Sequence, residues 1–101
     1  IAGTGIDIAS ISRMEKGLSR FGARFQGAKE AAVKALGTGF AGGVAPSDVS
    51  VLSLPSGQPF IRFAGRARER AEELGVTSVH VSITHDAGFA AAIVLLETGL
   101  R

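Results

Sequence analysis

An aspartate stands inside an apolar segment near the start of the chain. Asp7 is flanked by Ile6 and Ile8, and residues 1–11 have the small and β-branched composition of a strand. A carboxylate in such surroundings is costly unless it meets a cation or lies at the end of the strand. Two interpretations follow, a ligand for a hard cation and a capping or turn residue at the strand end. From this residue alone the second is the more common.

A glutamate and a lysine lie four residues apart in residues 28–36, the segment with the strongest helical composition. Glu30 and Lys34 therefore share one side of that helix, where the ordinary interpretation is a solvated ion pair worth about 0.3–0.5 kcal/mol. A chemical role requires Glu30 to meet Asp7, because two carboxylates with open positions suit Mg²⁺, which also keeps waters and substrate phosphates. Lys29 and Lys34 would then flank an anionic substrate.

Three other motifs give weaker signals. Residues 37–39 (GTG) look like part of a phosphate-binding loop, but they follow a helix rather than precede one, and ending that helix is the simpler role. His80 and His85 are five residues apart, so in one strand they face opposite ways and disfavour a zinc site. His80 fits a polar stripe with Ser82 and Thr84. A serine hydrolase is disfavoured because no Gly-x-Ser-x-Gly sequence is present.

The elements that must position these residues alternate between extended and helical patterns. We expect strands at 1–11, 49–54, 59–63, 79–84 and 89–96, and helices from about residue 13, at 28–36 and at 64–74. The apolar run at 89–96 has the composition of a buried strand. The order of strand, helices, two strands, helix and two strands predicts an α+β domain with an antiparallel-leaning sheet and packed helices.

Composition sets limits on the class of protein. The chain has 101 residues and a mass of 10.3 kDa, which fits a single domain. Hydrophobic residues make up 46% and charged residues 20%, so the chain is globular in composition. A mean hydropathy of +0.29 is high for a domain of this size and suggests an oligomer interface. The absence of cysteine excludes a disulfide scaffold, a cysteine-ligated metal and a thiol nucleophile, and fits the cytoplasm.

Positive charge is concentrated in the first 40 residues, which hold six basic and three acidic side chains. Such a field suits an anionic partner, although solubilising surface charge is the more common explanation. This leaves an alternative to an enzyme, namely a non-enzymatic basic α+β module that binds an acidic protein or nucleic acid. The alternative lacks stacking platforms, since tyrosine and tryptophan are absent.

Taken together and in order, several motifs resemble one family. Residues 5–8 (GIDI), 28–39 (AKEAAVKALGTG) and 80–85 (HVSITH) are similar to bacterial holo-acyl-carrier-protein synthase, the small class of 4′-phosphopantetheinyl transferase. Residues 48–51 (DVSV) and 57–59 (GQP) also look like that family. The resemblance covers nearly the whole chain. The combination is specific, although each piece is weak alone.

The resemblance implies a reaction and its partners. Coenzyme A is the donor, Mg²⁺ is the metal, a serine of apo acyl carrier protein is the acceptor, and adenosine 3′,5′-bisphosphate leaves. The implied fold is a small α+β domain that forms a homotrimer with active sites at subunit interfaces. The implied setting is fatty-acid and lipid biosynthesis in the cytoplasm, with no membrane and no nucleic acid as partner.

The resemblance also assigns roles to residues. Asp7 and Glu30 match the family's metal carboxylates, Lys34 matches the lysine beside the transferred phosphate, and these three are the expected catalytic residues. The expected coenzyme A-binding residues are Lys29, Lys34, Gly37, Thr38, Pro59 and His80. The expected carrier-protein-binding residues are Arg13, Arg20, Phe21 and Arg24, which agrees with the positive charge of the first 40 residues. The acceptor of the serine proton stays open between a metal-bound water and Glu30.

The chain departs from the family pattern at one place. Between Phe25 and Gln26 the family carries a further, mostly helical segment, and its Arg-Phe or Arg-Trp lead into the Lys-Glu block is replaced here by Phe25, Gln26 and Gly27. We therefore expect a single transferase domain over residues 1–101 from which a segment between Phe25 and Gln26 is missing. The missing segment would affect the contacts with the carrier protein and the covering of the bound coenzyme more than it would affect the metal site.

Overall fold

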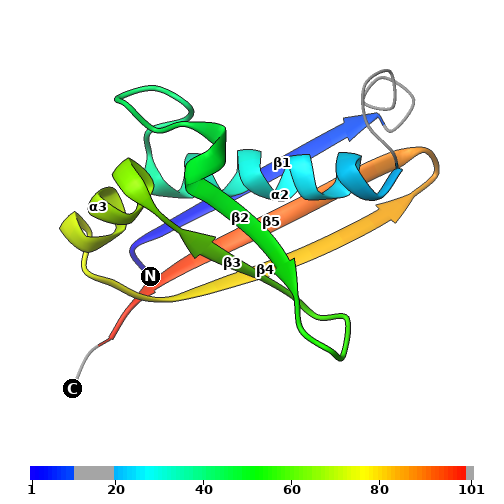
Figure 1. The fold of residues 1–101 in the computed structure, drawn as a ribbon. Helices are drawn as coiled ribbons and strands as arrows, with labels where there is room; N and C mark the ends of the chain where they lie inside the picture. The colour runs from blue at the N-terminus through cyan, green and yellow to red at the C-terminus, as the bar shows by residue number, and fades with distance from the viewer. Residues whose placement is uncertain (11–19, 100–101) are drawn as a thin grey trace.

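The computed structural model describes residues 1–10 and 20–99, and for Ser10 and residues 20–24 it describes the backbone alone. The elements are β1 (Gly3–Ser10), α2 (Arg20–Leu36), the short 3₁₀ helix η1 (Pro46–Asp48), β2 (Val49–Ser53), β3 (Pro59–Phe63), α3 (Gly65–Glu73), β4 (Val76–Asp86) and β5 (Phe89–Thr98) (Figure 1). The predicted α+β class is confirmed. Neither described helix is long and apolar enough to cross a membrane.

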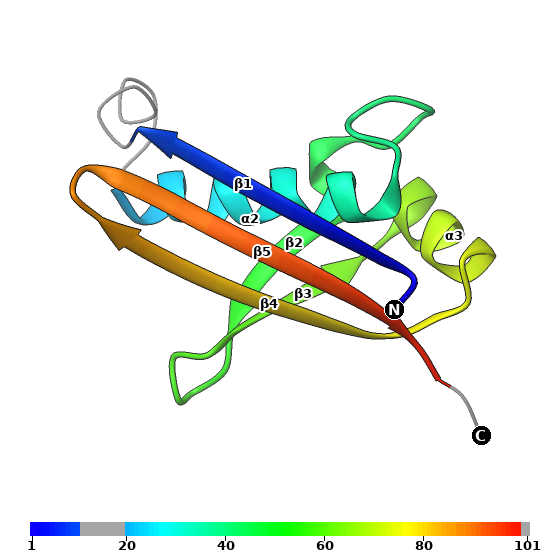
Figure 2. The same ribbon diagram turned by 180° about the vertical axis from the view of Figure 1, so that it is seen from behind.

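The strands form two antiparallel sheets. The larger sheet has the order β1-β5-β4, so that β5 lies in the centre, and the smaller sheet is the β2–β3 hairpin (Figure 2). In the larger sheet Ala92 of β5 lies between Asp7 of β1 and Ile83 of β4. The turn from β4 to β5 passes through Ala87 and Gly88, both with positive φ, which fits a tight hairpin.

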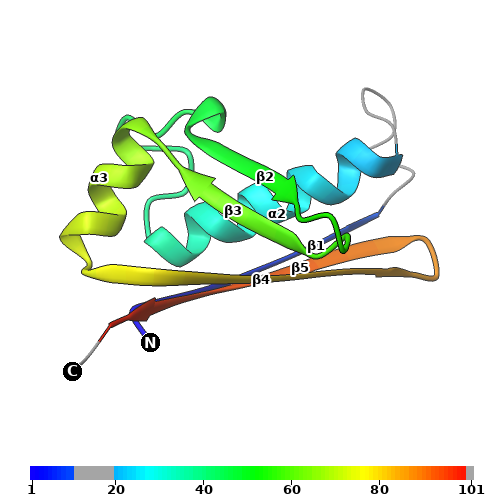
Figure 3. The ribbon, with the colours of Figure 1, turned by 60° about the horizontal axis from the view of Figure 1, so that its bottom comes forward.

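All other described elements lie on one side of the larger sheet. Helix α2 runs along this inner face against β1 and β5, and the β2–β3 hairpin and α3 lie on the same side (Figure 3). The opposite, outer face is not covered by any element that the structure describes. The fold is therefore a layer of helices and a hairpin on one face of an otherwise open sheet.

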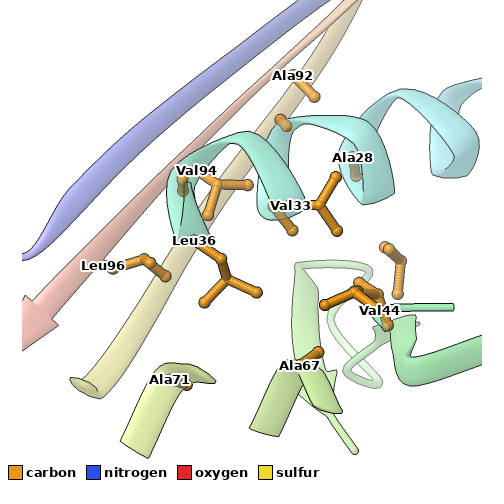
Figure 4. Close-up of a cluster of buried hydrophobic side chains, with 14 residues drawn as sticks. Ala28, Val33, Leu36, Val44, Ala67, Ala71, Ala92, Val94 and Leu96 are labelled. Atoms are coloured by element: carbon orange, nitrogen blue, oxygen red, sulfur yellow. The ribbon is translucent and has the colours of Figure 1, made fainter. Parts of the chain in front are cut away.

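The core lies between the inner face and α2. Its largest fully buried side chains are Leu36, Leu96, Val33, Val49 and Val94. Figure 4 shows Val33, Leu36 and Leu96 near the C-terminal end of α2. Small side chains complete it, with Ala67 and Ala71 supplied by the buried face of α3. The larger side chains thus anchor α2 at its C-terminal end, next to α3.

Two expectations about the elements need correction. Helix α2 begins at Arg20 rather than at residue 28, and it runs without interruption through Phe25 and Gln26. The prediction gave too much weight to glycine as a helix breaker, because contact with the sheet stabilises a helix whose intrinsic propensity is low. Strand β5 is buried on one face only, with Phe89 and Ile93 exposed. Its continuous apolar run reflects an uncovered sheet face, which periodicity alone does not distinguish from a buried strand.

Candidate functional site

Asp7 lies in the body of β1, three residues before the strand ends at Ser10. Its side chain is only 16% exposed and faces α2. The interpretation of Asp7 as a residue at the strand end is therefore wrong. A carboxylate in this position needs a cationic partner or polar contacts to offset its loss of hydration.

Two glycines before Asp7 let β1 approach the backbone of α2. A Cβ added at Gly5 would overlap the carbonyl oxygen of Ala31 and lie 2.7 Å from the nitrogen of Ala35, and one added at Gly3 would overlap the carbonyl of Ala35. Because alternate residues of a strand share a face, Gly3, Gly5 and Asp7 all point toward α2. The glycines thus set the short strand-to-helix distance at which the Asp7 side chain meets the helix.

On α2, Lys34 pairs with the Asp7 carboxylate and Gly27 lies close to it. A Cβ added at Gly27 would lie 3.3 Å from Asp7 Oδ2, and the Lys34 ammonium Nζ lies 3.4 Å from Asp7 Oδ1. Glu30 stands about one turn from each of them on the same side of the helix, as spacings of three and four residues require. Its carboxylate accepts a hydrogen bond of 3.4 Å from Gln26 Nε2. The helix therefore places Glu30 between Gly27 and Lys34.

The residues around Lys34 fit a hard cation. Nζ of Lys34 donates to the backbone carbonyl of Ile6 at 3.2 Å and to Asp7 Oδ1. A positively charged group is thus already held by oxygen atoms of β1, and Glu30 lies one turn from Lys34 on the same side of α2. Oxygen ligands of this kind are what Mg²⁺ prefers. In the described part of the chain no three His, Cys, Asp or Glu side chains gather as a metal cluster, so any ion here would rely on these two carboxylates and on other oxygen atoms.

Lys29 and the loop after α2 lie beyond this group. The Lys29 ammonium donates to the carbonyl of Pro46 at 3.4 Å and so links α2 to η1. Gly37 has a φ of +80°, and its N–H bonds the carbonyl of Lys34, while the N–H groups of Thr38 and Gly39 bond the carbonyl of Val33. The role of residues 37–39 in ending the helix is confirmed. The N–H groups of these three residues form hydrogen bonds with carbonyl groups at the end of α2.

Helix α3 holds the end of α2 and this loop in place. Arg70 Nε donates to the carbonyl of Leu36 at 3.0 Å, and Arg66 Nε donates to the carbonyl of Gly42 at 3.3 Å. Glu73 accepts hydrogen bonds from both arginines. The hydrogen bond from Arg66 is the largest cause of a lowered pKa at Glu73, and the same pair raises the pKa of Arg66.

The other predicted coenzyme-binding residues lie apart from Asp7. His80 is on the outer face of β4, where Nε2 lies 2.6 Å from Glu97 Oε1, whereas Asp7 faces inward. Pro59 begins β3 in the smaller sheet and pairs with Ser53. Within one chain the structure pairs Asp7 with Lys34, whereas His80 lies on the other face of the sheet. His80 and His85 lie at register positions on opposite faces, as strand parity predicts.

The predicted carrier-protein-binding residues lie at or before the start of α2. Arg13 lies outside the described residues. For Arg20, Phe21 and Arg24 the structure describes the backbone, which forms the first turns of α2, and not the side chains.

Sequence reasoning missed three contributions to the site. They are the close approach at Gly5, the position of Gly27 close to Asp7, and the backbone carbonyl of Ile6 that accepts from Lys34. The alternation of Gly3, Gly5 and Asp7 was a usable signal, because side chains two apart share a face and glycines there permit close packing. The carbonyl of Ile6 left no signal in the sequence.

The outer face of the larger sheet is apolar and open. Ile6 and Ile8 of β1 are 63% and 68% exposed, and Phe89 and Ile93 of β5 are exposed beside them. A hollow of about 240 Å³ lies on this face, lined in part by Ile6, Ile93 and Thr84. Contiguous exposed apolar surface of this kind is typical of an interaction site.

Comparisons with known proteins agree on one family. The family described as the 4′-phosphopantetheinyl transferase superfamily matches residues 19–94. A protein of Nitratidesulfovibrio vulgaris (strain Hildenborough) named holo-[acyl-carrier-protein] synthase is 43% identical over 123 aligned positions, covering 97% of this chain and 99% of the relative. One of the same name from Desulfovibrio desulfuricans is 42% identical over 121 positions, covering 96% and 98%. Both alignments are longer than the chain.

A solved structure is similar over nearly the same extent. The holo-[acyl-carrier-protein] synthase of Helicobacter pylori, solved in complex with coenzyme A, has a TM-score of 0.73 and 31% sequence identity. The match covers 93% of this chain and 99% of that one. The synthase of Plasmodium yoelii shares the fold with a TM-score of 0.81 at 22% identity, covering 99% and 97%.

Proposed function

The chain belongs to the 4′-phosphopantetheinyl transferase superfamily, and we propose that it acts as a holo-acyl-carrier-protein synthase. The enzyme transfers the 4′-phosphopantetheine group of coenzyme A to a serine of apo acyl carrier protein. The observation that carries this proposal is the Asp7 carboxylate of β1, which pairs with Lys34 of α2, the helix that also carries Glu30 one turn before Lys34. Two carboxylates and a lysine on this side of the fold support a role in positioning a phosphoryl group and neutralising its charge.

We propose Mg²⁺ as the metal, held by Asp7 and Glu30. The support is the donor set described above, in which oxygen atoms of β1 already hold the ammonium group of Lys34. When bound, such an ion neutralises negative charge on the diphosphate of coenzyme A. Lys34 then supplies a second positive charge to the oxygens of the transferred phosphate, and Lys29, five residues earlier on α2, is a further proposed contact of the coenzyme.

The reaction that these residues position is a displacement at phosphorus. The serine hydroxyl oxygen of the carrier protein attacks the phosphorus that bears pantetheine, and the bond from that phosphorus to adenosine 3′,5′-bisphosphate breaks. Lys34 stabilises the negative charge on the phosphoryl oxygens as the transition state forms. The remaining proposed coenzyme contacts are Gly37, Thr38, Pro59 and His80.

We propose that the protein assembles as a homotrimer through the outer face of the larger sheet. The exposed side chains of Ile6, Ile8, Phe89 and Ile93 support this, since a monomer would leave them in water. Assembly through this face also accounts for His80, which lies on it and away from Asp7. At a boundary between subunits, one coenzyme molecule could then contact Lys34 of one subunit and His80 of the other. We place the enzyme in the cytoplasm.

The acidic carrier protein is proposed to dock on Arg13, Arg20, Phe21 and Arg24. The excess of positive charge in the first 40 residues supports this, and docking of this kind is sensitive to salt. We also propose that the chain lacks a segment between Phe25 and Gln26 that its relatives carry. Alignments of 121 and 123 positions against a chain of 101 residues support this proposal.

A direct experiment tests the activity. The protein is incubated with coenzyme A, Mg²⁺ and apo acyl carrier protein, and the carrier protein is examined by intact mass spectrometry. We expect the carrier to gain the mass of phosphopantetheine, and the gain to disappear when EDTA replaces Mg²⁺ or when the acceptor serine is changed to alanine. A carrier protein that stays in its apo form under these conditions contradicts the proposed function. Salt-dependent binding to nucleic acid without transfer would instead favour the basic binding module.

A further inference from the structure

The ammonium group of Lys34 stands among oxygen atoms that a metal would use. Its Nζ lies 3.2 Å from the carbonyl oxygen of Ile6 and 3.4 Å from Asp7 Oδ1. The Asp7 side chain is 16% exposed and the Lys34 side chain 52% exposed, so the carboxylate is partly buried while the lysine reaches it from solvent. In the described part of the chain Lys34 is the ion-pair partner of Asp7.

Such a pair is held weakly and can be exchanged. Ion pairs with one partner in solvent contribute little net stability, because the Coulomb energy is screened and the lysine loses rotamer freedom. A divalent cation at Asp7 brings two positive charges to the same carboxylate. Two cations a few ångströms apart repel each other unless further negative charge is present. Lys34 and the metal therefore compete for Asp7 until another anion arrives.

We propose that Lys34 is a resident counter-ion that a divalent cation must displace from Asp7, and that the diphosphate of the coenzyme then becomes the partner of Lys34. This inference rests on the proposed function and adds an order of events to it. In the free protein Lys34 opposes metal binding, and in the presence of coenzyme it no longer does so. Metal and coenzyme therefore bind cooperatively, and Lys34 is the residue that couples them.

The chain offers a control outside the proposed site. Arg68 of α3 also carries one positive charge, but its Nε pairs with Glu72 at 3.6 Å instead of with Asp7. Removing the charge of Arg68 changes the overall charge by the same amount as removing that of Lys34. A difference between Lys34→Met and Arg68→Met therefore reports the contact with Asp7 and not the general field of the protein.

The test measures metal affinity and not turnover. Mn²⁺ is titrated into the free protein, with free Mn²⁺ followed by electron paramagnetic resonance, and Mg²⁺ is titrated by calorimetry. We expect Lys34→Met to bind either ion about two- to fivefold more tightly than the wild type, the factor that loss of a half-exposed ion pair corresponds to. Arg68→Met keeps the wild-type affinity, and Lys34→Arg restores it.

The same titration with coenzyme A present, and without carrier protein, tests the coupling. We expect coenzyme A to tighten metal binding to the wild type by a larger factor than to Lys34→Met. Lys34→Gln, which keeps a polar side chain, serves as a second variant if the methionine variant is poorly folded by circular dichroism.

Two results would overturn the inference. One is a Lys34→Met protein that binds Mn²⁺ as weakly as the wild type or more weakly, and the other is equal coupling to coenzyme A in both proteins. If either occurs while the wild type still modifies the carrier protein, the exchange role of Lys34 fails alone. If no divalent ion binds and no transfer occurs, the proposed function fails with it.

Discussion

The two faces of β1 differ in a way that reverses the usual pattern. The inner face of β1 carries Gly3, Gly5 and Asp7 against α2, whereas the outer face of the same strand exposes Ile6 and Ile8. Small residues thus lie inside and large apolar residues outside. The alternation of one strand separates two tasks, a close contact with the helix and a surface that needs a covering partner.

The distance between β1 and α2 is set by small residues. Contacts between glycine and alanine contribute little apolar burial, but they bring two backbones close and leave little room for adjustment. Of the large buried side chains, Leu36 and Leu96 lie near the C-terminal end of α2. The end of α2 near α3 therefore provides stability, while the contact along β1 fixes the distance between Asp7 and the residues of the helix.

The largest expected effect is at the inner face, on the two carboxylates. Asp7→Ala and Glu30→Ala should each reduce transfer by about a thousandfold or more, because a bound cation contributes several kcal/mol to stabilising the transition state. Both variants should keep the circular dichroism spectrum of the wild type. The measurement is the rate of carrier-protein modification by mass spectrometry.

Glu72→Ala is the matched control for these two variants, since Glu72 is an exposed carboxylate of α3 that pairs with Arg68. It should modify the carrier protein at the wild-type rate. Near-normal transfer by Asp7→Ala or Glu30→Ala would refute the metal assignment.

The next largest effect is at Gly5. In Gly5→Ala the added Cβ meets the backbone of Ala31 and pushes β1 away from α2. The substitution should therefore destabilise the protein by about 2–3 kcal/mol. It should also lower the transfer rate of the protein that remains folded, because Asp7 is moved away from the helix. Urea denaturation measures the first quantity and saturating turnover of the folded fraction the second. Thr4→Val, on the other face of the same strand, should change neither by much. Wild-type stability in Gly5→Ala would show that the strand and the helix do not approach as closely as described.

The outer face should affect assembly rather than chemistry. Ile93→Lys places a charge in the middle of the exposed apolar surface and should shift the proposed trimer to a monomer in light scattering coupled to gel filtration, because a buried lysine cation is costly. Leu54→Lys is the control, because Leu54 is equally exposed. It lies in the turn between β2 and β3, which is not part of the outer face of the larger sheet. A trimer that persists in Ile93→Lys would place the interface elsewhere.

The smallest effect is expected at Glu73, remote from both faces. The hydrogen bond from Arg66 lowers the pKa of Glu73 in the folded protein, so the interaction stabilises the fold above the pKa of the unfolded glutamate and is lost as the pH falls through the folded pKa. Glu73→Gln should therefore lower the Tm slightly at pH 7, and the difference from the wild type should vanish in acid. A difference that stays constant with pH would assign the effect to packing instead.

Much of the fold followed from local patterns in the sequence. The hairpin strands β2 and β3 and the helix α3 were predicted almost to the residue, because turn residues and a charged amphipathic repeat mark their ends. The start of α2 was not, since Gly22 and Gly27 disfavour a helix that contact with the sheet nevertheless stabilises. The exposure of Phe89 and Ile93 was also missed, because local sequence does not say whether a second layer covers a sheet face.

The site was predicted less evenly. Asp7, Glu30 and Lys34 were identified from residue type and spacing together with a family resemblance, and the structure pairs Asp7 with Lys34. The ion-pair partner of Lys34 was expected to be Glu30 on the same helix. In the structure it is Asp7, which is 27 residues earlier in the sequence, on β1. Which carboxylate pairs with Lys34 depends on the position of β1 along α2. This position is set by backbone contacts at Gly5, and the only sign of it in the sequence is the alternation of glycines before Asp7.

The most direct test of the central claim is to locate the divalent ion. Crystals grown with coenzyme A and Mn²⁺ should give an anomalous peak between the carboxylates of Asp7 and Glu30, about 2.0–2.2 Å from an oxygen of each, with Lys34 turned from Asp7 toward the diphosphate. An anomalous peak elsewhere, or coenzyme bound with Asp7 still paired to Lys34 and no ion between the carboxylates, would contradict the account.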